Sequence, residues 1–379
     1  MKISSLELFH ISIPFAEPYH LSKIYGTLYD AQAVIVKINT DEGLTGLGEA
    51  DPMAPFTEES PQAVMALLHD IVGPIIIGRD PRKINQLESD LDNRISGYST
   101  ARGAINMALY DILGKSKQIP VYELLGGLRH EKLPLLLGIS SLDLDASIAA
   151  IDKLRSQGVK TIMLKMGEMP VADEVRRFVS LSEHYGEQVN LVVDPNQGWE
   201  VSEALEFIEG INGYHLDLLE QPIQRHDLAG LRKICERAVC SLSADESLVE
   251  PEDAAVLIRD GVVNVFSIKV SKNGGLDKSK LIAQMAEGFG LKCLMNSMLE
   301  FGITQAASLY LGCTLPNLME CGHAYGSVTR MADDITDFGR NISDGYVNVP
   351  AKPGLGVKLR QDKLQKYTQN HLVVSQSAE

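Results

Sequence analysis

Cysteine, tryptophan and basic residues are all scarce in this sequence, and each shortage narrows what the protein can be. The 379 residues include five cysteines and one tryptophan, and 35 basic side chains stand against 50 acidic ones, which gives a formal net charge of −15. Because the cysteine count is odd and no Cys-x-x-Cys pair occurs, we expect neither a disulfide framework nor a structural zinc site. The excess of acid leaves no sequence-wide basic face for phosphate backbones, so nucleic acid is not an expected partner.

Long apolar runs are also missing. The longest run near the N-terminus, residues 71–78, contains Pro74 and is far shorter than the roughly 20 residues that a membrane-spanning helix needs. Residues 1–5 alternate apolar and polar side chains and show no signal-peptide pattern. We therefore expect a cytoplasmic protein without a membrane partner.

Length and local patterns predict a large domain together with a smaller one. A single hydrophobic core stops growing at about 250–300 residues, which the 379 residues exceed. In the N-terminal third, residues 5–9 and 33–38 have the alternation and β-branched content of strands, whereas residues 62–71 and 101–115 have the apolar spacing of helices. This part of the chain is therefore predicted to be an α+β unit.

From about residue 132 onward, short apolar runs alternate with helical patterns, which is typical of a parallel sheet. Eight such runs predict a closed α/β barrel, because an open nucleotide-binding sheet would need a Gly-rich turn after its first strand and none is present. We expect an α+β domain over residues 1–128, a barrel domain over 129–345, and a tail over 346–379 that packs back on the first domain. The eight expected strands are residues 133–139, 161–166, 189–193, 214–219, 240–244, 262–268, 291–295 and 317–319.

Charged residues end five successive expected strands. Lys165, Asp194, Glu220, Asp245 and Lys269 follow one another at intervals of 24 to 29 residues, one β/α unit each. The C-terminal ends of barrel strands meet at one mouth, where the active sites of such barrels lie. The spacing therefore predicts that three carboxylates converge at this mouth, with the two lysines on opposite sides of them.

Converging carboxylates repel one another unless a cation lies between them, and Mg²⁺ suits a site that leaves room for substrate oxygens. A lysine ammonium that is partly desolvated beside such a cation is disfavoured, so we expect the lysine pKa values to fall toward neutrality, as a general base requires. The chemistry that needs these parts is removal of the proton next to a carboxylate, with the metal stabilising the enediolate that forms.

Several motifs resemble the enolase superfamily and, within it, the muconate-lactonizing-enzyme-like subgroup, in which a lysine or histidine base works beside Mg²⁺. The resemblance covers nearly the whole chain and implies an α+β capping domain over a modified TIM barrel, (β/α)7β. It also implies Mg²⁺, or Mn²⁺ as a substitute, a small-molecule carboxylate substrate and a homo-oligomer. The segments that carry the resemblance are 104–111, 124–127, Asp194-Pro195-Asn196, Glu220-Gln221-Pro222, Asp245-Glu246-Ser247 and 269–275.

The resemblance also implies roles for individual residues. Asp194, Glu220 and Asp245 match the metal ligands of the subgroup, and Lys165 and Lys269 match its acid–base pair. Residues in the loop after the first strand and near the ends of the third, fifth and seventh barrel strands are expected to contact substrate or to support the ligands. These residues are Lys23, Tyr25, Asn196, Glu246, Ser297 and Glu300.

Two positions depart from the subgroup pattern. The subgroup usually has Lys-x-Lys at the second strand, whereas here Met163 stands two residues before Lys165, so one cation that would lower the lysine pKa is missing. Dipeptide epimerases of the subgroup carry Asp-x-Asp at the eighth strand to hold the substrate ammonium. Here a single carboxylate, Glu320, and His323 are the candidates for that role.

These features predict a Mg²⁺-dependent isomerase, a racemase or epimerase of an amino-acid-derived carboxylate that moves a proton between Lys165 and Lys269. A lyase on the same scaffold, which would dehydrate a β-hydroxy carboxylate such as a hydroxyproline or sugar acid, stays open, and so does a cycloisomerase. A catalytically silent metal-binding barrel is the alternative from another class. It has no need of two opposed bases, so the lysine pair disfavours it.

Overall fold

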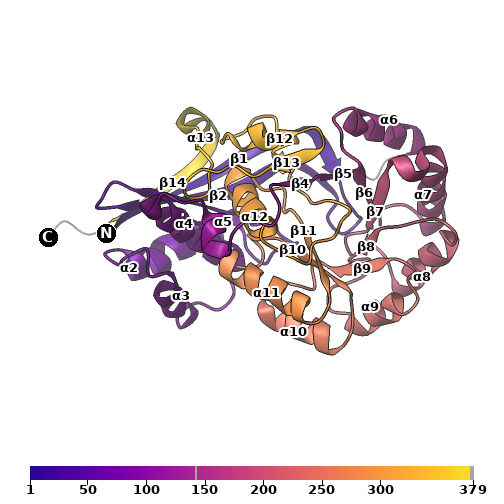
Figure 1. The fold of residues 1–379 in the computed structure, drawn as a ribbon, viewed down its shortest axis with the longest axis horizontal. Coiled ribbons are helices and arrows are strands. Elements are labelled where there is room, and N and C mark those ends of the chain that lie inside the picture. Colours follow the sequence, from indigo (N-terminus) through magenta and orange to yellow (C-terminus); the bar gives the residue numbers. More distant parts are fainter. Residues whose placement is uncertain (141–142, 376–379) are drawn as a thin grey trace.

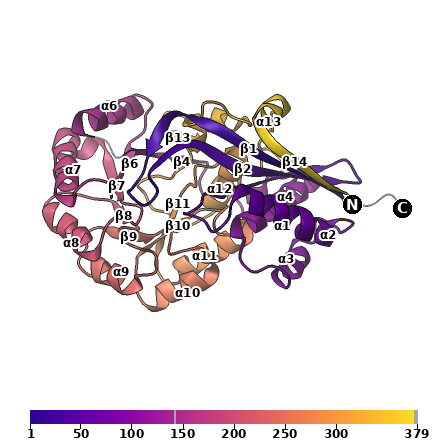
Figure 2. The same cartoon turned by 180° about the vertical axis from the view of Figure 1, so that it is seen from behind.

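The computed structural model describes residues 1–140 and 143–375 and contains two packed units (Figure 1). One unit is an antiparallel sheet backed by helices, and the other is a ring of parallel strands inside a ring of helices (Figure 2). The expected fold class, a modified TIM barrel with an α+β capping domain, is therefore confirmed. Within the described residues, no helix combines the length and the apolar character needed to pass through a membrane.

The capping sheet is antiparallel, with the strand order β14-β1-β2-β3. Its side chains alternate between two cores, because successive residues of a strand point to opposite faces. Leu6 and Leu8 pack with the capping helices, whereas Ile11 and Ile13 belong to the core shared with the barrel. The strands are β1 (Ile3–His20), β2 (Thr27–Thr40), β3 (Thr45–Ala50) and, from the C-terminal part of the chain, β14 (Thr368–Ser375).

The capping helices lie against one face of this sheet, and α4 approaches β3 most closely. A Cβ atom added to Gly46 would come within 2.2 Å of the Ala108 carbonyl oxygen, and one added to Gly48 within 1.9 Å of that of Ala104. Glycine at both positions therefore lets the helix backbone rest directly on the strand. The helices are α1 (Pro61–Leu67), α2 (Gly73–Ile76), α3 (Ile84–Asp92), α4 (Ser99–Lys117) and α5 (Val121–Leu125), with a π-helical turn at Leu68–Val72.

The barrel consists of a seven-stranded parallel sheet, in which each strand is followed by a helix. The strands are β5 (Leu136–Ile139), β6 (Thr161–Lys165), β7 (Asn190–Asp194), β8 (Leu218–Glu220), β9 (Ser241–Ala244), β10 (Val265–Ile268) and β11 (Lys292–Met295). The helices are α6 (Leu144–Arg155), α7 (Val171–Tyr185), α8 (Val201–Gly210), α9 (Leu228–Cys235), α10 (Pro251–Arg259), α11 (Leu276–Gly288) and α12 (Gly302–Gly312), with a 3₁₀ turn at Gly186–Gln188.

Residues 317–324 close the ring between β11 and β5. Leu318 forms a parallel bridge with Cys293, and His323 forms one with Leu135. The residues between these bridges leave the regular strand pattern, so the expected eighth strand is present as two isolated pairings. Seven β/α units followed by this closing segment make the (β/α)7β arrangement.

Short elements around the base of the barrel join it to the C-terminal part of the chain. The run expected to form one strand over 133–139 is divided, because β4 pairs antiparallel with β13, whereas β5 pairs parallel with β6. The chain therefore changes partners at Leu135 before it enters the barrel. The remaining elements are β4 (Lys132–Pro134), β12 (Ile342–Ser343), β13 (Tyr346–Asn348), α13 (Gln361–Tyr367) and 3₁₀ turns at Ser327–Thr329 and Phe338–Asn341.

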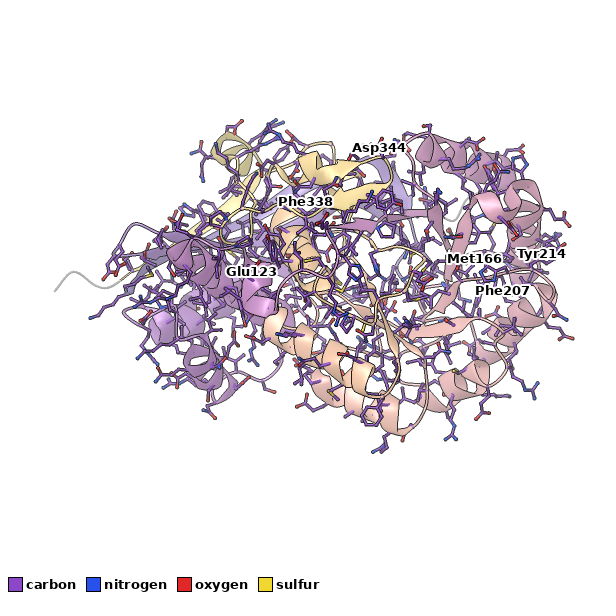
Figure 3. The ribbon with its side chains drawn as sticks, in the orientation of Figure 1. Glu123, Met166, Phe207, Tyr214, Phe338 and Asp344 are labelled. Atoms are coloured by element: carbon purple, nitrogen blue, oxygen red, sulfur yellow. The ribbon has the colours of Figure 1, made fainter. Side chains whose placement is uncertain are left out.

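Apolar side chains fill the layer between strands and outer helices. Phe207 of α8 meets Phe178 of α7 edge to face with ring centroids 5.7 Å apart. Phe207 and Met166 belong to the same buried core, on the side of the barrel where α7 and α8 pack (Figure 3). A smaller core inside the barrel, which includes Met163, forms the floor beneath its mouth.

A buried carboxylate fastens the capping sheet to the barrel. Glu49 of β3 accepts hydrogen bonds from the backbone N–H groups of Phe301 (2.6 Å), Ile303 (3.1 Å) and Thr304 (3.2 Å) at the start of α12. These groups have no partner within their own helix, so Glu49 satisfies donors that the fold leaves free. Burial, together with the neighbouring Asp51, raises the pKa of Glu49 well above its usual range.

Replacing this carboxylate should weaken the whole molecule. We expect Glu49→Ala to lower the free energy of unfolding by about 3 kcal/mol, because it leaves buried backbone donors without acceptors. Urea unfolding at pH 7 measures the change. The control is Glu206→Ala on the exposed face of α8, and equal stability losses in the two variants would contradict the fastening role.

Candidate active site

Five charged side chains from neighbouring strands gather at the mouth of the barrel. Lys165, Asp194 and Glu220 are the last residues of β6, β7 and β8, and Asp245 and Lys269 follow directly after β9 and β10. All five are buried. The structure thus brings together the five residues that the strand spacing selected, because each β/α unit returns the chain to the same end of the barrel.

The lysines and aspartates at the mouth form ion pairs. Lys165 Nζ contacts Asp194 Oδ2, and Lys269 Nζ lies 2.6 Å from Asp245 Oδ2. A third lysine, Lys272, donates to Asp245 Oδ1 at 2.7 Å and to its carbonyl oxygen at 2.5 Å. Asp245 therefore holds two ammonium groups at once, and these cations outweigh its burial and lower its pKa below the usual range.

The expected lowering of the lysine pKa values applies beside a bound divalent cation and stays a prediction, whereas ion pairing without a cation raises both pKa values. Burial alone lowers the pKa of Lys165, but the adjacent Asp194 outweighs it and the net shift is upward. The pKa of Lys269 is raised in the same way, chiefly by Asp245. Direct contact with a carboxylate stabilises the ammonium more than burial destabilises it, and the strand spacing alone does not reveal that contact.

Glu220 lies between the two ion pairs and keeps one oxygen free. Its Oε1 accepts hydrogen bonds from Ser267 Oγ at 3.1 Å and from Asn296 Nδ2 at 2.6 Å, whereas its buried Oε2 has no partner among the described residues. Burial and the charges of Asp194 and Asp245 raise the pKa of Glu220 well above its usual range. An uncompensated buried carboxylate is costly, so this position is suited to a cation.

The donor set fits a hard divalent cation. Asp194, Glu220 and Asp245 offer carboxylate oxygens, the ligands that Mg²⁺ prefers, and the unpartnered Glu220 oxygen is one that a cation would satisfy. Among the described residues, no three His, Cys, Asp or Glu side chains already form a metal-binding group. Lys165 and Lys269 contact aspartate oxygens in this arrangement, so a cation would compete with the ammonium groups for them. The magnesium site therefore stays a prediction.

A second layer of polar side chains links the mouth to the capping loop. Tyr25 donates a hydrogen bond to Glu246 Oε1 at 3.2 Å and accepts one from Gln197 Nε2 at 2.6 Å. The Asn196 backbone N–H donates to Asp194 Oδ1 at 2.8 Å, and its side-chain oxygen is buried without a partner. Burial and the charge of Asp245 raise the pKa of Glu246 to about 8.

Strained backbone collects around the same mouth. Asn196, Gln197, Gln221 and Leu299 have φ angles of 45°, 63°, 30° and 67°, in the left-handed region that residues other than glycine rarely adopt. Each follows β7, β8 or β11 near the strand end. Such conformations persist only where the surrounding contacts hold them, and they are typical of binding and catalytic sites.

A cavity of about 70 Å³ lies above the floor of the barrel and is bordered by both lysines. Met163 forms part of its wall, below Lys165 on the same strand. The Phe56 ring closes another side, with its centroid 4.2 Å from Lys269 Nζ. A hollow of about 240 Å³ shares Met53 and Leu299 with the cavity, and one of about 410 Å³ shares Phe56.

The loop after β11 contributes to this cavity only in part. Ser297 lines it, whereas Glu300 is buried behind the loop and is not among the lining residues. Glu300 accepts hydrogen bonds from the Ser297 hydroxyl, the Met298 backbone N–H and Gln305 Nε2. Burial and the nearby Asp51 raise its pKa to about 7. These bonds hold the shape of the loop that borders the cavity, and a contact between Glu300 and substrate stays a prediction.

Three expected substrate contacts lie elsewhere. Lys23 is exposed and points to Glu203 at 3.9 Å, and Glu320 is exposed in the irregular part of the closing segment. His323 is buried in the seam of the barrel, where Nδ1 accepts the Met295 backbone N–H at 3.1 Å. These three residues do not line the cavity, and no Asp or Glu is among the described residues that do line it.

Several residues that sequence reasoning did not select lie at the site. Lys272 has a detectable signal, since it follows Lys269 by one turn in the same post-strand segment, and Asn296 directly follows β11. Tyr19 and Arg330 come from segments far apart in the sequence and have no local pattern. Both line the cavity.

The buried histidine should affect stability in acid. Burial and the neighbouring His130 lower the pKa of His323 from its usual 6.5 to about 3, so the folded state binds fewer protons than the unfolded state. Its contribution to stability is therefore complete above about pH 6.5 and declines as pH falls toward 3. We expect His323→Gln to make urea stability less pH-dependent across this range. Exposed His215→Gln is the control, and an unchanged profile would contradict the expectation.

Replacing the Glu220 carboxylate should have opposite effects on the stability of the metal-free protein and on cation binding. Glu220→Gln keeps the shape of the side chain and removes a buried charge, so without metal we expect stability to rise by about 1 kcal/mol. We also expect Mg²⁺ to raise the melting temperature of the wild-type protein and to leave that of the variant unchanged. Thermal unfolding with EDTA and with Mg²⁺ measures both effects, and an undiminished Mg²⁺ response in the variant would rule Glu220 out as a ligand.

Two family descriptions match the chain. Residues 4–126 match the mandelate racemase/muconate lactonizing enzyme N-terminal domain, and residues 146–363 match the enolase C-terminal domain-like family. Together they cover the capping unit except β14, and the barrel from α6 into α13.

Individual relatives are similar over nearly their full length. The L-Ala-D/L-Glu epimerase of Bacillus subtilis is 29% identical over 94% of this chain and 97% of its own. The crystal structure of the N-succinyl Arg/Lys racemase of Bacillus cereus has a TM-score of 0.94 at 28% identity and covers 99% of this chain and 100% of that one. That of the muconate lactonizing enzyme of Pseudomonas fluorescens, complexed with muconolactone, has a TM-score of 0.93 at 29% identity, with 97% and 99% covered. The chain therefore belongs to the mandelate racemase/muconate lactonizing enzyme family of the enolase superfamily.

Proposed function

We propose that the protein is a Mg²⁺-dependent racemase or epimerase of an amino-acid-derived carboxylate, in which Lys165 and Lys269 exchange the α-proton with opposite faces of the substrate. The proposal is supported above all by the placement of the two lysines. They border one cavity and extend from β6 and β10, which are four positions apart in the ring of strands. A substrate lying between them presents one face of its α-carbon to each Nζ atom.

The carboxylate row positions the substrate for this transfer. Mg²⁺ held by Asp194, Glu220 and Asp245 would stabilise the negative charge that develops on the substrate carboxylate as the α-proton leaves. Lys165 and Lys269 then have complementary tasks, because the lysine that begins neutral accepts the proton at Cα and the one that begins as an ammonium donates its own to the other face. The two lysines end with their protonation states exchanged, and proton exchange with water resets them.

The walls of the cavity support proton transfer by keeping water out. Phe56 and Met53 from the capping unit, and Met298 from the loop after β11, close apolar surface over the lysines. In such a setting, charged hydrogen bonds are stronger than in water and the transferred proton is protected from the solvent. Met163 adds no second cation beside Lys165, which distinguishes this site from one with Lys-x-Lys.

A cycloisomerase is the second candidate, and it is supported by the muconate lactonizing enzyme among the structural relatives. Such a reaction needs one acid–base lysine, whereas racemisation needs both. Conversion of a muconate to its lactone distinguishes this activity from the proposed one. The loss of the diene absorbance measures that conversion.

Single lysine variants test the racemisation directly. In D₂O with Mg²⁺, we expect the wild-type protein to introduce deuterium at Cα of both enantiomers of an N-acylated amino acid. Because each lysine reaches one face, Lys165→Ala should abolish exchange from one enantiomer and Lys269→Ala from the other, with rate losses of roughly 10²–10⁴. NMR follows the α-proton. Exposed Lys160→Ala at the base of β6 is the matched control, and racemisation at wild-type rates in both active-site variants would refute the mechanism.

A further inference from the structure

Lys165 lies at the point where the chain leaves β6, and the sheet supports it there on one side only. On the β5 side, the regular pairing ends at Ile139 and Leu164, one residue before the lysine. On the β7 side, Lys165 is itself the last paired residue, opposite Asp194. The backbone that carries this lysine therefore depends on support from outside the sheet.

A buried arginine of α7 supplies that support. Arg177 Nη1 donates a hydrogen bond to the carbonyl oxygen of Lys165 at 3.0 Å, and Nη2 donates one to that of Ser140, the residue after β5, also at 3.0 Å. Its Nε donates to Ser147 Oγ in α6 at 2.9 Å. The guanidinium thus joins β5 to β6 just beyond the point where their regular pairing ends.

This placement of Arg177 costs stability. The side chain is buried, and its hydrogen bonds within the described residues all go to neutral oxygens. Burial lowers the pKa of the guanidinium to about 10, so the group is still charged at pH 7. A buried charge is costly, and apolar side chains of similar volume are often at least as stable in such positions. The arginine is therefore better explained by the backbone that it holds than by its contribution to stability.

A second charged residue of α7 holds the next part of the same segment. Glu174 lies one turn before Arg177, and its two carboxylate oxygens accept the Gly167 backbone N–H and Trp199 Nε1, each at 2.7 Å. The Gly167 carbonyl oxygen accepts the backbone N–H of Lys23, in the loop after β1, at 3.1 Å. Helix α7 therefore fixes the chain on both sides of Met166.

Lys269, at the other side of the cavity, is held in a different way. Its backbone N–H donates to Asn273 Oδ1 at 2.8 Å, and its carbonyl oxygen accepts the Asn273 backbone N–H at 2.8 Å. Asn273 Nδ2 donates to the carbonyl oxygens of Leu248 and Val249 in the segment after β9. Within the described residues, Arg177 and Asn273 share no hydrogen-bond partner. The two lysines are therefore held by separate contacts.

We propose that Arg177 is a positioning residue for Lys165 and that Asn273 is one for Lys269, so each face of the substrate is served by a lysine with its own support. The inference rests on the proposed function, in which each lysine reaches one face of the α-carbon. A displaced backbone moves Nζ away from that carbon, and a misplacement of about 1 Å can slow a reaction roughly 10²-fold. Loss of one support should therefore slow proton transfer at one face alone.

The test follows α-deuterium exchange of both enantiomers of an N-acylated amino acid, and Lys165→Ala identifies the enantiomer that Lys165 serves. We expect Arg177→Met to lower kcat for that enantiomer by roughly 10- to 100-fold, with its KM and the exchange of the other enantiomer within about twofold of wild type. Asn273→Ala should give the reverse pattern. Arg177→Lys should recover part of the loss, and Arg176→Met, at an exposed neighbouring position on α7, should match wild type.

NMR of lysines labelled with carbon-13 at Cε gives a second measurement that needs no turnover. The signals of Lys165 and Lys269 are assigned by their loss in Lys165→Ala and Lys269→Ala. We expect Arg177→Met to shift the Lys165 signal and to leave that of Lys269 in place, and Asn273→Ala to do the opposite. This pattern supports the inference even where the wild-type protein exchanges no α-proton, and that absence would count against the proposed function alone.

A role of Arg177 in general stability would give a different result. Similar losses for both enantiomers in folded Arg177→Met, or similar shifts of both lysine signals, overturn the inference, and so does wild-type behaviour of that variant in both measurements. Circular dichroism establishes folding. If the methionine variant does not fold, Arg177→Lys takes its place, and an effect on both faces or on neither has the same meaning.

Discussion

Removing charges from water at the mouth of the barrel is the constraint on which this structure depends. Asp245 is stable there because Lys269 and Lys272 each hold one of its carboxylate oxygens. Asp194 is stable because Lys165 contacts its Oδ2 and the Asn196 backbone N–H donates to its Oδ1. Glu220 has only neutral donors on one oxygen and none on the other. A fold that buries such a group without compensation sacrifices stability, and the natural compensation is the cation that the three carboxylates would share.

The capping unit turns this charged mouth into an enclosed cavity. Glu49 joins β3 to the start of α12, and Tyr25 reaches from the loop after β1 to Glu246 beside the carboxylate row. Both contacts unite residues that are more than two hundred positions apart in the sequence. Enclosure lowers the local dielectric constant and strengthens every ionic interaction inside, so the contacts that stabilise the two-unit fold also determine the electrostatics of the site.

The fold and the central site residues could be predicted because they depend on repetition. Each β/α unit returns the chain to one end of the barrel, so the spacing of Lys165, Asp194 and Glu220 was enough to place them together. The direction of the lysine pKa shifts could not be predicted in the same way. It depends on whether Nζ and a carboxylate oxygen are in contact. Lys269 Nζ lies 2.6 Å from Asp245 Oδ2, and this contact opposes the effect of burial on the lysine pKa.

The sequence by itself determined the class of fold, the family and the row of charges at the strand ends, because those follow from periodicity and from local motifs. Only the tertiary structure decided which side chains face the cavity. The closing segment is irregular between its two bridges, so alternation does not predict that Glu320 is exposed and His323 is buried in the seam. At the mouth, Arg330 donates to the carbonyl oxygen of Gly138, nearly two hundred residues earlier, and the missing side chain of that glycine leaves room for the Tyr19 hydroxyl. Such contacts have no trace in local sequence.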